Sequence, residues 1–287
     1  MNFDKRITPA RADLADERLR GQIEASRYSA GATKRIVAPS APLRRHPTPD
    51  APLDTEALMG ERVTVYDEEE GWAWGQLHAD GYVGYLPSAA LGEASIEPNH
   101  RVTVLRTFVY PGPNLKLPPE RFLSLNAAVA LTAAEGDYAR LASGGYVFAA
   151  HLANMDTREP DFVAVAERLI GAPYLWGGKT SLGLDCSGLI QVSLAAAGIP
   201  APRDTDMQEA ALGEPVAATS DLMGLRRGDL VFWKGHVGVM LDGERLLHAN
   251  GHHMLVAVEP LRAAVARILE ESYGPITSIR RLRGAPG

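Results

Sequence analysis

The 287-residue chain contains a single cysteine, Cys186. One cysteine excludes an intramolecular disulfide and any metal site that needs several thiolates, and it fits a reducing compartment. No run of about 18 apolar residues is present, so we expect no membrane-spanning helix. The N-terminal residues lack the apolar core and the small-residue cleavage site of a secretory signal. These absences predict a cytoplasmic protein.

Basic charge is also scarce. The chain has 29 Lys and Arg against 35 Asp and Glu, a net charge of -6, so we expect neither nucleic acid nor an anionic membrane as a partner. Hydrophobic residues make up 46% and charged residues 22%, which is typical of an ordinary globular protein. The adjacent His252 and His253 have no third metal ligand at a recognisable spacing, so we expect no metal site and no cofactor.

Residues 1–49 are expected to form a surface helix followed by a connector. Ala15, Leu19 and Ile23 recur at a spacing of four, which predicts a short helix over residues 12–28. Residues 38–53 contain five prolines, which oppose a helix and favour an extended connector.

An alternation of apolar and polar residues begins near Ala57. Short predicted strands over residues 62–66, 72–77 and 82–86 are separated by acidic and glycine-containing turns, a pattern typical of a small β-barrel. The pattern of residues 70–83 recurs over residues 135–147. We therefore expect two small β-barrel domains, over residues 50–95 and 96–156.

The periodicity changes to that of a helix after Thr157. Phe162, Val165 and Leu169 fall on one face of a predicted helix that ends at Gly171. The sequence also predicts helices over 186–197 and 261–271, and strands over 229–233, 236–241, 246–249 and 276–282. Helices followed by an antiparallel run of strands indicate an α+β domain over residues 157–287.

Cys186 begins a predicted helix, and Asp185 is its natural N-cap. The unpaired N–H groups and the partial positive charge at a helix N-terminus favour the thiolate, which is the nucleophilic form of cysteine. A buried structural cysteine is an equally good interpretation of this position alone.

Two histidines downstream are candidate partners of the cysteine. His236 begins an apolar strand between Gly235 and Gly238, which allow close backbone approach, and a histidine base must come within hydrogen-bond reach of the sulfur. His248 lies on the next predicted strand, where it can accept a hydrogen bond from the ring N–H of His236 and fix its tautomer. For either histidine alone, a half-buried strand residue without a chemical role is the simpler interpretation.

Together these stretches resemble the NlpC/P60 family of cell-wall cysteine peptidases. The resemblance depends on six segments that occur in order: Pro-Tyr-Leu-Trp-Gly-Gly at 173–178, Leu-Asp-Cys-Ser-Gly-Leu-Ile at 184–190, Pro-Arg-Asp-Thr at 202–205, Gly-Asp-Leu-Val-Phe-Trp at 228–233, Gly-His-Val-Gly-Val at 235–239 and Leu-His-Ala at 247–249. The barrels resemble bacterial SH3-like domains, which narrows the resemblance to the γ-D-glutamyl-L-diamino acid endopeptidases. The implied fold is a papain-like α+β catalytic domain preceded by two SH3-like β-barrels.

The resemblance implies a role for each matched residue. Cys186 is the nucleophile, His236 the base and His248 the residue that orients it. The implied substrate is a murein peptide with a free N-terminal L-alanine, cut between the γ-carboxyl of D-glutamate and a diamino acid. The residues that the resemblance implies for substrate binding are Asp185, Ser187, Asp204, Thr205, Tyr82 and Glu61. Trp176 is added to this set as a residue that lines the cleft, although it could equally fill the core. Thr205 replaces the more usual serine and keeps the hydroxyl.

Two other functions compete with this one. An amidase or acyltransferase on the same scaffold would use the same cysteine and histidines, and an inert wall-binding protein would use only the barrels. The complete Cys-His-His set and Asp204 favour the peptidase. The choice between lysine and diaminopimelate as the diamino acid, the use of free or wall-bound peptide, and the oligomeric state stay open.

Overall fold

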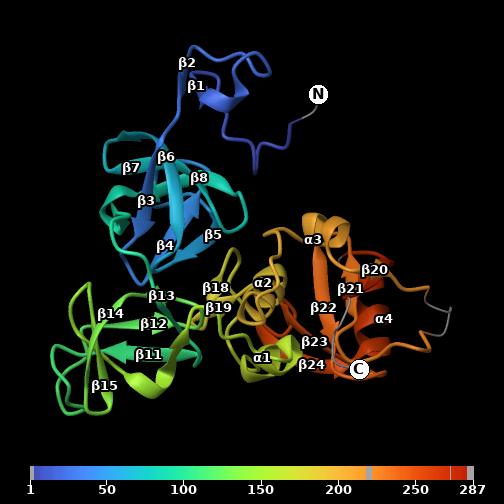
Figure 1. The fold of residues 1–287 in the computed structure, drawn as a ribbon. Helices are drawn as coiled ribbons and strands as arrows, with labels where there is room; N and C mark the ends of the chain where they lie inside the picture. Colours follow the sequence, from blue (N-terminus) through green and yellow to red (C-terminus); the bar gives the residue numbers. More distant parts are fainter. Residues whose placement is uncertain (1–2, 218–221, 272, 283–287) are drawn as a thin grey trace. The chain divides into compact units, whose positions relative to one another are not determined.

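The computed structural model describes residues 3–217, 222–271 and 273–282, and Figure 1 shows the elements along the chain. The chain divides into two units, residues 1–157 and residues 158–287, and the division lies one residue from the predicted start of the α+β domain. No helix among the described residues is long and apolar enough to cross a membrane.

The N-terminal segment contains a parallel strand pair in place of the predicted helix. β1 (Leu14–Asp16) pairs with β2 (Arg27–Ser29), and a 3-10 turn, Glu17–Leu19, lies between them. The helix prediction is wrong because tertiary contacts outweigh the four-residue spacing. Leu14 is fully buried in a cluster with Tyr66 and Trp74, and the Asp16 carboxylate caps the 3-10 turn while accepting a 2.6 Å hydrogen bond from the Tyr66 hydroxyl.

The first barrel is a seven-stranded sheet of order β5-β4-β8-β7-β6-β3-β9. Its strands are β3 (Ala32–Ile36), β4 (Ser40–Arg44), β5 (Leu53–Leu58), β6 (Arg62–Glu69), β7 (Trp72–Leu77), β8 (Val83–Pro87) and β9 (Leu91–Glu93). The sheet therefore begins well before residue 50, and residues 40–44 are a strand where a connector was predicted. Ala41 and Leu43 are fully buried in the barrel core while Pro42 lies on the other face, so the alternation tolerates the proline.

A second set of strands follows over residues 100–154. Its sheets are β13-β10-β17, β11-β12 and β14-β15-β16. The strands are β10 (His100–Val102), β11 (Arg106–Val109), β12 (Arg121–Ser124), β13 (Ala128–Val129), β14 (Leu131–Glu135), β15 (Tyr138–Leu141), β16 (Tyr146–Phe148) and β17 (Leu152–Asn154). Val102, Val109, Leu123 and Val147 are fully buried in a core that Met59, the residue after β5 of the first barrel, also joins.

The second unit combines four helices with a six-stranded antiparallel sheet of order β20-β25-β21-β22-β23-β24 in its described residues. The helices are α1 (Phe162–Arg168), α2 (Cys186–Ala196), α3 (Thr205–Ala211) and α4 (Leu261–Glu271). The strands are β20 (Glu214–Pro215), β21 (Leu230–Trp233), β22 (His236–Met240), β23 (Arg245–Asn250), β24 (Leu255–Pro260) and β25 (Ile276–Arg281), with a short hairpin of β18 (Lys179–Thr180) and β19 (Gly183–Leu184). The mixed helix and strand content predicted for this part is confirmed. The short α3, the strand β24, the β18–β19 hairpin and the two-residue β20 were not predicted.

Helices cover both faces of this sheet. Val231, Trp233 and Met240 pack against Leu261 and Ile268 of α4, while α1 and α2 lie on the opposite side (Figure 1). Every residue of β21 and β22 is buried, which explains why both strands are continuous apolar runs rather than alternating ones.

Candidate active site

Cys186 is the first residue of α2 and is 7% exposed. β22 pairs with β23 only through Val239 and Met240. The backbone N–H of Val237, which lies before this paired part, donates to the Cys186 sulfur. The Thr205 hydroxyl at the start of α3 lies 3.9 Å from the same sulfur. The sulfur is therefore held where the first residues of α2, α3 and β22 meet, and Val237 directly follows His236 in sequence.

The resting cysteine is a thiol. Burial, and then the charge of Asp185, raise the pKa of Cys186 to about 11. The expectation that the helix N-terminus favours the thiolate is wrong for the resting protein. Burial penalises the charged form, and the capping carboxylate offsets the partial positive charge of the helix terminus.

Asp185 is the N-cap of α2 and half of a buried ion pair. Its Oδ1 accepts the backbone N–H of Gly188 at 2.7 Å, and its Oδ2 accepts that of Gly177 at 2.9 Å. The Arg203 guanidinium donates to both oxygens, at 3.0 and 2.7 Å, and also to the Ser187 hydroxyl at 2.8 Å. The Arg203 side chain is only 1% exposed, so its charge is removed from water and is paired with Asp185.

The two candidate histidines are in direct contact. Nε2 of His236 lies 2.8 Å from Nδ1 of His248, and Nε2 of His248 lies 2.7 Å from Oε1 of Glu259. An ionised carboxylate only accepts, so we assign the His248 proton to Nε2, and Nδ1 of His248 then accepts from Nε2–H of His236. Nδ1 of His236 keeps its lone pair, and no described residue, Cys186 included, forms a hydrogen bond with it.

Both imidazoles are neutral at ordinary pH. Burial, and then the proximity of His248, lower the pKa of His236 to about 3. Burial also lowers the pKa of His248, although the Glu259 carboxylate opposes that shift. Tyr273 stacks on the His236 ring, with 5.3 Å between the centroids and 5° between the planes, and holds the ring in place. The site is thus a neutral thiol beside a neutral base.

Two glycines make this packing possible. A Cβ on Gly188 would lie 2.2 Å from the carbonyl oxygen of Gly178, so the loop before α2 approaches the helix backbone directly. A Cβ on Gly238 would lie 2.7 Å from Cδ1 of Leu246 and 3.1 Å from Cβ of His248. The close approach predicted at Gly238 is confirmed, and it lets His248 reach His236.

The other residues of the second unit that were predicted to bind the substrate differ in burial and in their contacts. Ser187 is buried and donates to Asp185 at 3.3 Å. Asp204 is the N-cap residue of α3 without a side-chain capping bond, and Thr205 follows it beside the sulfur. Trp176 is 65% exposed, so its side chain is not part of the core.

Two predicted substrate residues belong to the first unit. Tyr82 is 4% exposed and packs in the core of the first barrel, and Glu61 precedes β6 with a half-buried side chain. Their assignment to the substrate stays a prediction.

Several residues of the site were missed from the sequence. Arg203, Glu259 and Tyr273 are described above, and the remaining two are Gln208 and Arg267. Gln208 is fully buried and donates to the backbone oxygens of Ser187 and Pro202, and Arg267 pairs with Glu259. The signal for Gln208 was present, because Arg203 and Gln208 flank Asp204 and Thr205 in one short segment. Nothing local in the sequence marks Glu259 or Tyr273, which reach the histidines only through the fold.

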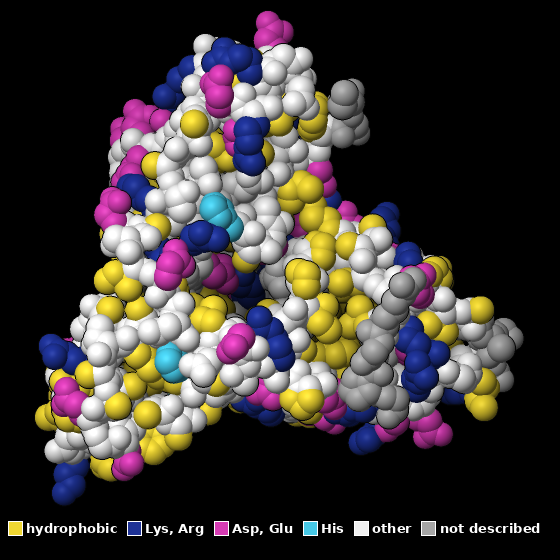
Figure 2. Space-filling model, in the orientation of Figure 1, with side chains coloured by type: hydrophobic (Ala, Val, Ile, Leu, Met, Phe, Trp, Pro, Cys, Tyr) yellow, Lys and Arg dark blue, Asp and Glu magenta, His cyan; other side chains and the backbone are white. Residues whose placement is uncertain are grey.

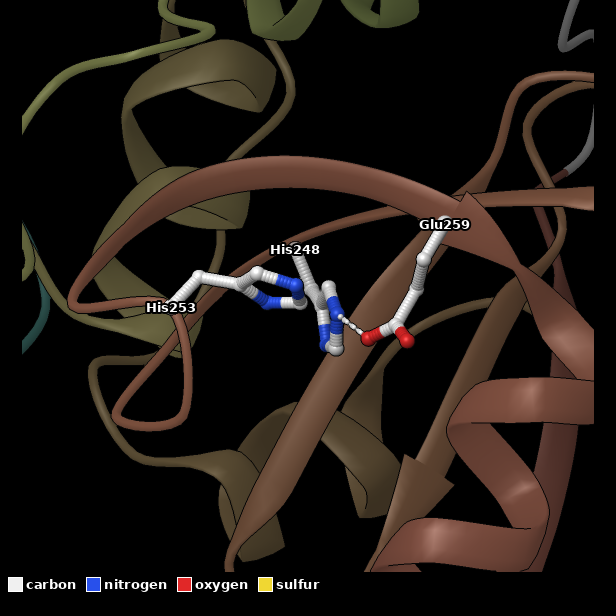
Figure 3. A group of neighbouring side chains, drawn as sticks. All are labelled: His248, His253 and Glu259. Atoms are coloured by element: carbon white, nitrogen blue, oxygen red, sulfur yellow. Dashed lines mark hydrogen bonds and ion pairs between the residues drawn. The ribbon is translucent and has the colours of Figure 1, made fainter.

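Three side chains of the kinds that bind metals lie close together next to His236. They are His248, His253 and Glu259 (Figure 3), and one donor atom from each lies within 4.8 Å of the others. The partners of His253 are therefore on two strands and do not include the adjacent His252. The search for a third ligand by sequence spacing failed because His248 and Glu259 are on neighbouring strands, β23 and β24.

Comparison with known families identifies two parts of the chain. Residues 171–267 match the NlpC/P60 family, and residues 43–91 match the bacterial dipeptidyl-peptidase SH3 domain. The second match begins within β4, in agreement with the early start of the first sheet.

Curated and solved relatives cover most of the chain. A γ-D-glutamyl-L-lysine dipeptidyl-peptidase of Bacillus cereus is 26% identical over 73% of this chain and 71% of its own length. The enzyme of the same name from Bacillus subtilis is 28% identical over 70% of this chain and 73% of its own. A crystal structure of an NlpC/P60 family protein from Bacillus cereus superposes with a TM-score of 0.72 at 21% identity, covering 87% of this chain and 99% of that one, which shows a shared fold.

Proposed function

The chain joins a bacterial dipeptidyl-peptidase SH3 domain to an NlpC/P60 domain, and we propose that it is a cysteine endopeptidase acting on murein peptides. The bond cut is that between the γ-carboxyl of D-glutamate and the following diamino acid, in peptides with a free N-terminal L-alanine. The relatives named γ-D-glutamyl-L-lysine dipeptidyl-peptidase support this reaction. The single observation that carries the chemistry is the His236–His248 hydrogen bond beside Cys186.

The first half of the reaction forms a thioester. The Cys186 sulfur attacks the γ-amide carbonyl carbon while its proton passes to Nδ1 of His236, which carries a lone pair in the resting site. His248 accepts from the imidazolium and Glu259 lies behind it, so the positive charge formed in this step is stabilised. Collapse of the tetrahedral intermediate breaks the C–N bond, and His236 gives its proton to the departing amine of the diamino acid.

Two donors suit the oxyanion of that intermediate. The backbone N–H of Cys186 is at the first position of α2, where helix geometry provides no acceptor. Burial, and then proximity to the Cys186 charge, raise the pKa of Tyr174, so its hydroxyl stays protonated near the sulfur. In the second half-reaction a water gives a proton to His236 and attacks the thioester, which releases L-Ala-γ-D-Glu and restores the thiol.

Recognition of the free alanine amine is assigned to the residues around the start of α3. Thr205 is next to the sulfur, and Asp204 precedes it with a carboxylate that does not cap α3. Asp185 and Ser187 are engaged with Arg203, so in our proposal they complete the wall of this subsite rather than supply its net charge. An ammonium near Asp204 forms an ion pair that an acetylated N-terminus cannot form. Tyr82, Glu61 and Trp176 complete the proposed set.

Two further parts of the proposal concern organisation and location. We assign residues 96–156 to a second SH3-like domain, supported by its three small sheets and by the hydrophobic core that its strands surround. We assign the enzyme to murein recycling in the cytoplasm, where free peptides are its substrate, and cell fractionation with antibody detection tests that location.

The deciding experiment compares two peptides by mass spectrometry. One is L-Ala-γ-D-Glu-L-Lys, with its diaminopimelate form, and the other is the same peptide N-acetylated; Cys186→Ala serves as the inactive control. We expect release of L-Ala-γ-D-Glu from the free peptide alone. Cleavage of both would disprove amine recognition, and cleavage of neither with an alkylatable Cys186 would point to an amidase or acyltransferase.

A further inference from the structure

The side chains of His248, His253 and Glu259 converge beside the proposed catalytic base (Figure 3). We propose that they form a binding site for a divalent transition-metal ion, Zn²⁺ in particular, whose occupation switches the peptidase off. The inhibitory part rests on the proposed function, whereas the metal site itself does not.

The donor atoms need only a small adjustment to hold a metal. All three lie within 4.8 Å of one another, and the His248–Glu259 pair is already at 2.7 Å. Tetrahedral zinc with bonds of about 2.1 Å separates its ligand atoms by roughly 3.4 Å. His253 is on an exposed turn after β23, so its ring has room to close the remaining distance of up to about 1.4 Å. His248 also lines a surface pocket with His236, His252 and Arg267, so one of the three ligands can be reached from solvent.

Each ligand already has the outer partner that metal sites require. Nδ1–H of His253 donates to Oδ1 of Asn250 at 3.0 Å, which leaves the lone pair of the ring on Nε2. The same oxygen accepts the backbone N–H of His253 at 2.8 Å and fixes the turn. His248 is oriented by His236 and Glu259 by Arg267. This preorganisation is the feature that distinguishes the group from a chance cluster.

The donor set selects the kind of ion. Two imidazole nitrogens and one carboxylate oxygen suit Zn²⁺ and its neighbours, whereas Mg²⁺ and Ca²⁺ prefer sites made entirely of oxygen. The Arg267 guanidinium on Glu259 opposes a second cation, so we expect reversible binding rather than a permanently held metal.

Occupation of the site would remove the catalytic base through a change of tautomer. A metal takes the lone pair of Nε2 of a neutral His248 only if the His248 proton is on Nδ1. Nδ1–H of His248 then donates to Nε2 of His236, and the His236 proton must reside on Nδ1, the nitrogen that acts as the base in the proposed reaction. No proton is gained or lost by the pair, but His236 now presents an N–H where catalysis needs a lone pair.

The binding test uses the full-length Cys186→Ala protein, which removes the thiol as a competing zinc ligand. Zinc binding is measured by competition with a chromogenic chelator for Cys186→Ala and for two double variants, in which His253→Gln or His252→Gln is combined with Cys186→Ala. We expect one zinc per chain, affinity reduced at least about tenfold by His253→Gln, and no change with His252→Gln on the same turn. No zinc binding by Cys186→Ala, or unchanged affinity on adding His253→Gln, would overturn the site whether or not the enzyme cleaves murein peptides.

The switch itself is tested by spectroscopy and kinetics. Long-range ¹H–¹⁵N spectra of the histidine rings in Cys186→Ala should show the His236 proton on Nε2 without zinc and on Nδ1 with it. In the Cys186 enzyme zinc should lower kcat with little effect on KM, a chelator should restore it, and His253→Gln should need at least about tenfold more zinc. An unmoved His236 proton, or equal inhibition of His253→Gln, would overturn the switch.

Discussion

The two units treat charge in opposite ways. In the first unit most ion pairs lie near the surface, such as Lys34–Glu68 with side chains 26% and 41% exposed, and Figure 2 shows acidic and basic side chains interspersed there. In the second unit the Asp185–Arg203 pair is buried beside Cys186, with 11% and 1% exposure. His236 and His248, which belong to the same site, are also buried.

The two kinds of ion pair differ in their exposure to water, and this exposure determines how much each contributes to stability. A surface pair gains little because water screens it, whereas a buried pair must recover a large desolvation cost through good geometry. Among the described residues of the second unit, Asp229 is also fully buried in a pair with Arg281, but the Asp185–Arg203 pair is the one that lies beside the cysteine. We infer that its buried polar groups are there for chemistry and positioning, and that those of the barrels mainly fix the chain.

The largest effect should come from the reacting groups. Cys186→Ala and His236→Ala should each lower kcat by at least about 10³-fold, because one removes the nucleophile and the other its base. Peptide release measured by mass spectrometry gives kcat, and urea unfolding gives stability. Cooperative unfolding close to wild type is expected for Cys186→Ala; a collapse of cooperativity would assign the cysteine a structural role and erase the contrast between the units.

The sequence predicted the catalytic unit better than the barrels. The positions of Cys186, His236 and His248 followed from local patterns, since a helix start and two apolar strands are determined by near neighbours. The contact between the histidines also followed, because β22 and β23 are adjacent in sequence and in the sheet. The start of the first barrel did not, because β4 obtains its register from β5 and β8 rather than from its own proline-rich composition.

The protonation state of the site was outside the reach of sequence patterns. A helix N-terminus alone favours a thiolate, but burial and the Asp185 charge reverse that preference in the folded chain. Glu259 was also hidden, since its link to His248 depends on cross-strand neighbours. Quantities that depend on desolvation need the three-dimensional neighbourhood of a group, which spacing does not contain.

A second test replaces the buried cation. Arg203→Met keeps much of the side-chain volume but leaves the Asp185 carboxylate buried without its partner, so we expect a loss of about 3–5 kcal/mol in the free energy of unfolding. Lys34→Met in the first unit is the matched control and should cost less than about 1 kcal/mol. Urea unfolding measures both. Equal losses would contradict the contrast between buried and surface charge.

A third test titrates the buried histidine. The folded pKa of His236 is about 3 against an ordinary 6.5, so the unfolded chain binds the proton first. Its contribution to stability is complete above pH 6.5 and is lost as the pH falls towards 3, by at most about 1.4 kcal/mol per pH unit. Urea unfolding at pH 7, 6 and 5 should show a shallower slope for His236→Gln than for wild type. The exposed His46→Gln should leave the slope unchanged, and a similar slope in all three proteins would refute burial of a neutral imidazole.

The smallest expected effect concerns Tyr82, a residue of the first barrel that the proposal assigns to substrate binding. Tyr82→Phe removes one hydroxyl and keeps the ring in the barrel core, so we expect KM for the free-amine peptide to rise about fivefold, equivalent to about 1 kcal/mol, with KM for other substrates unchanged. Tyr66→Phe is the control, since it loses a buried hydrogen bond to Asp16 and should lower stability by about 1 kcal/mol without changing KM. Unchanged kinetics in Tyr82→Phe would return Tyr82 to the barrel core alone. A rise in KM in both variants would instead mean that KM follows barrel stability, because only a direct contact with the substrate separates the two tyrosines.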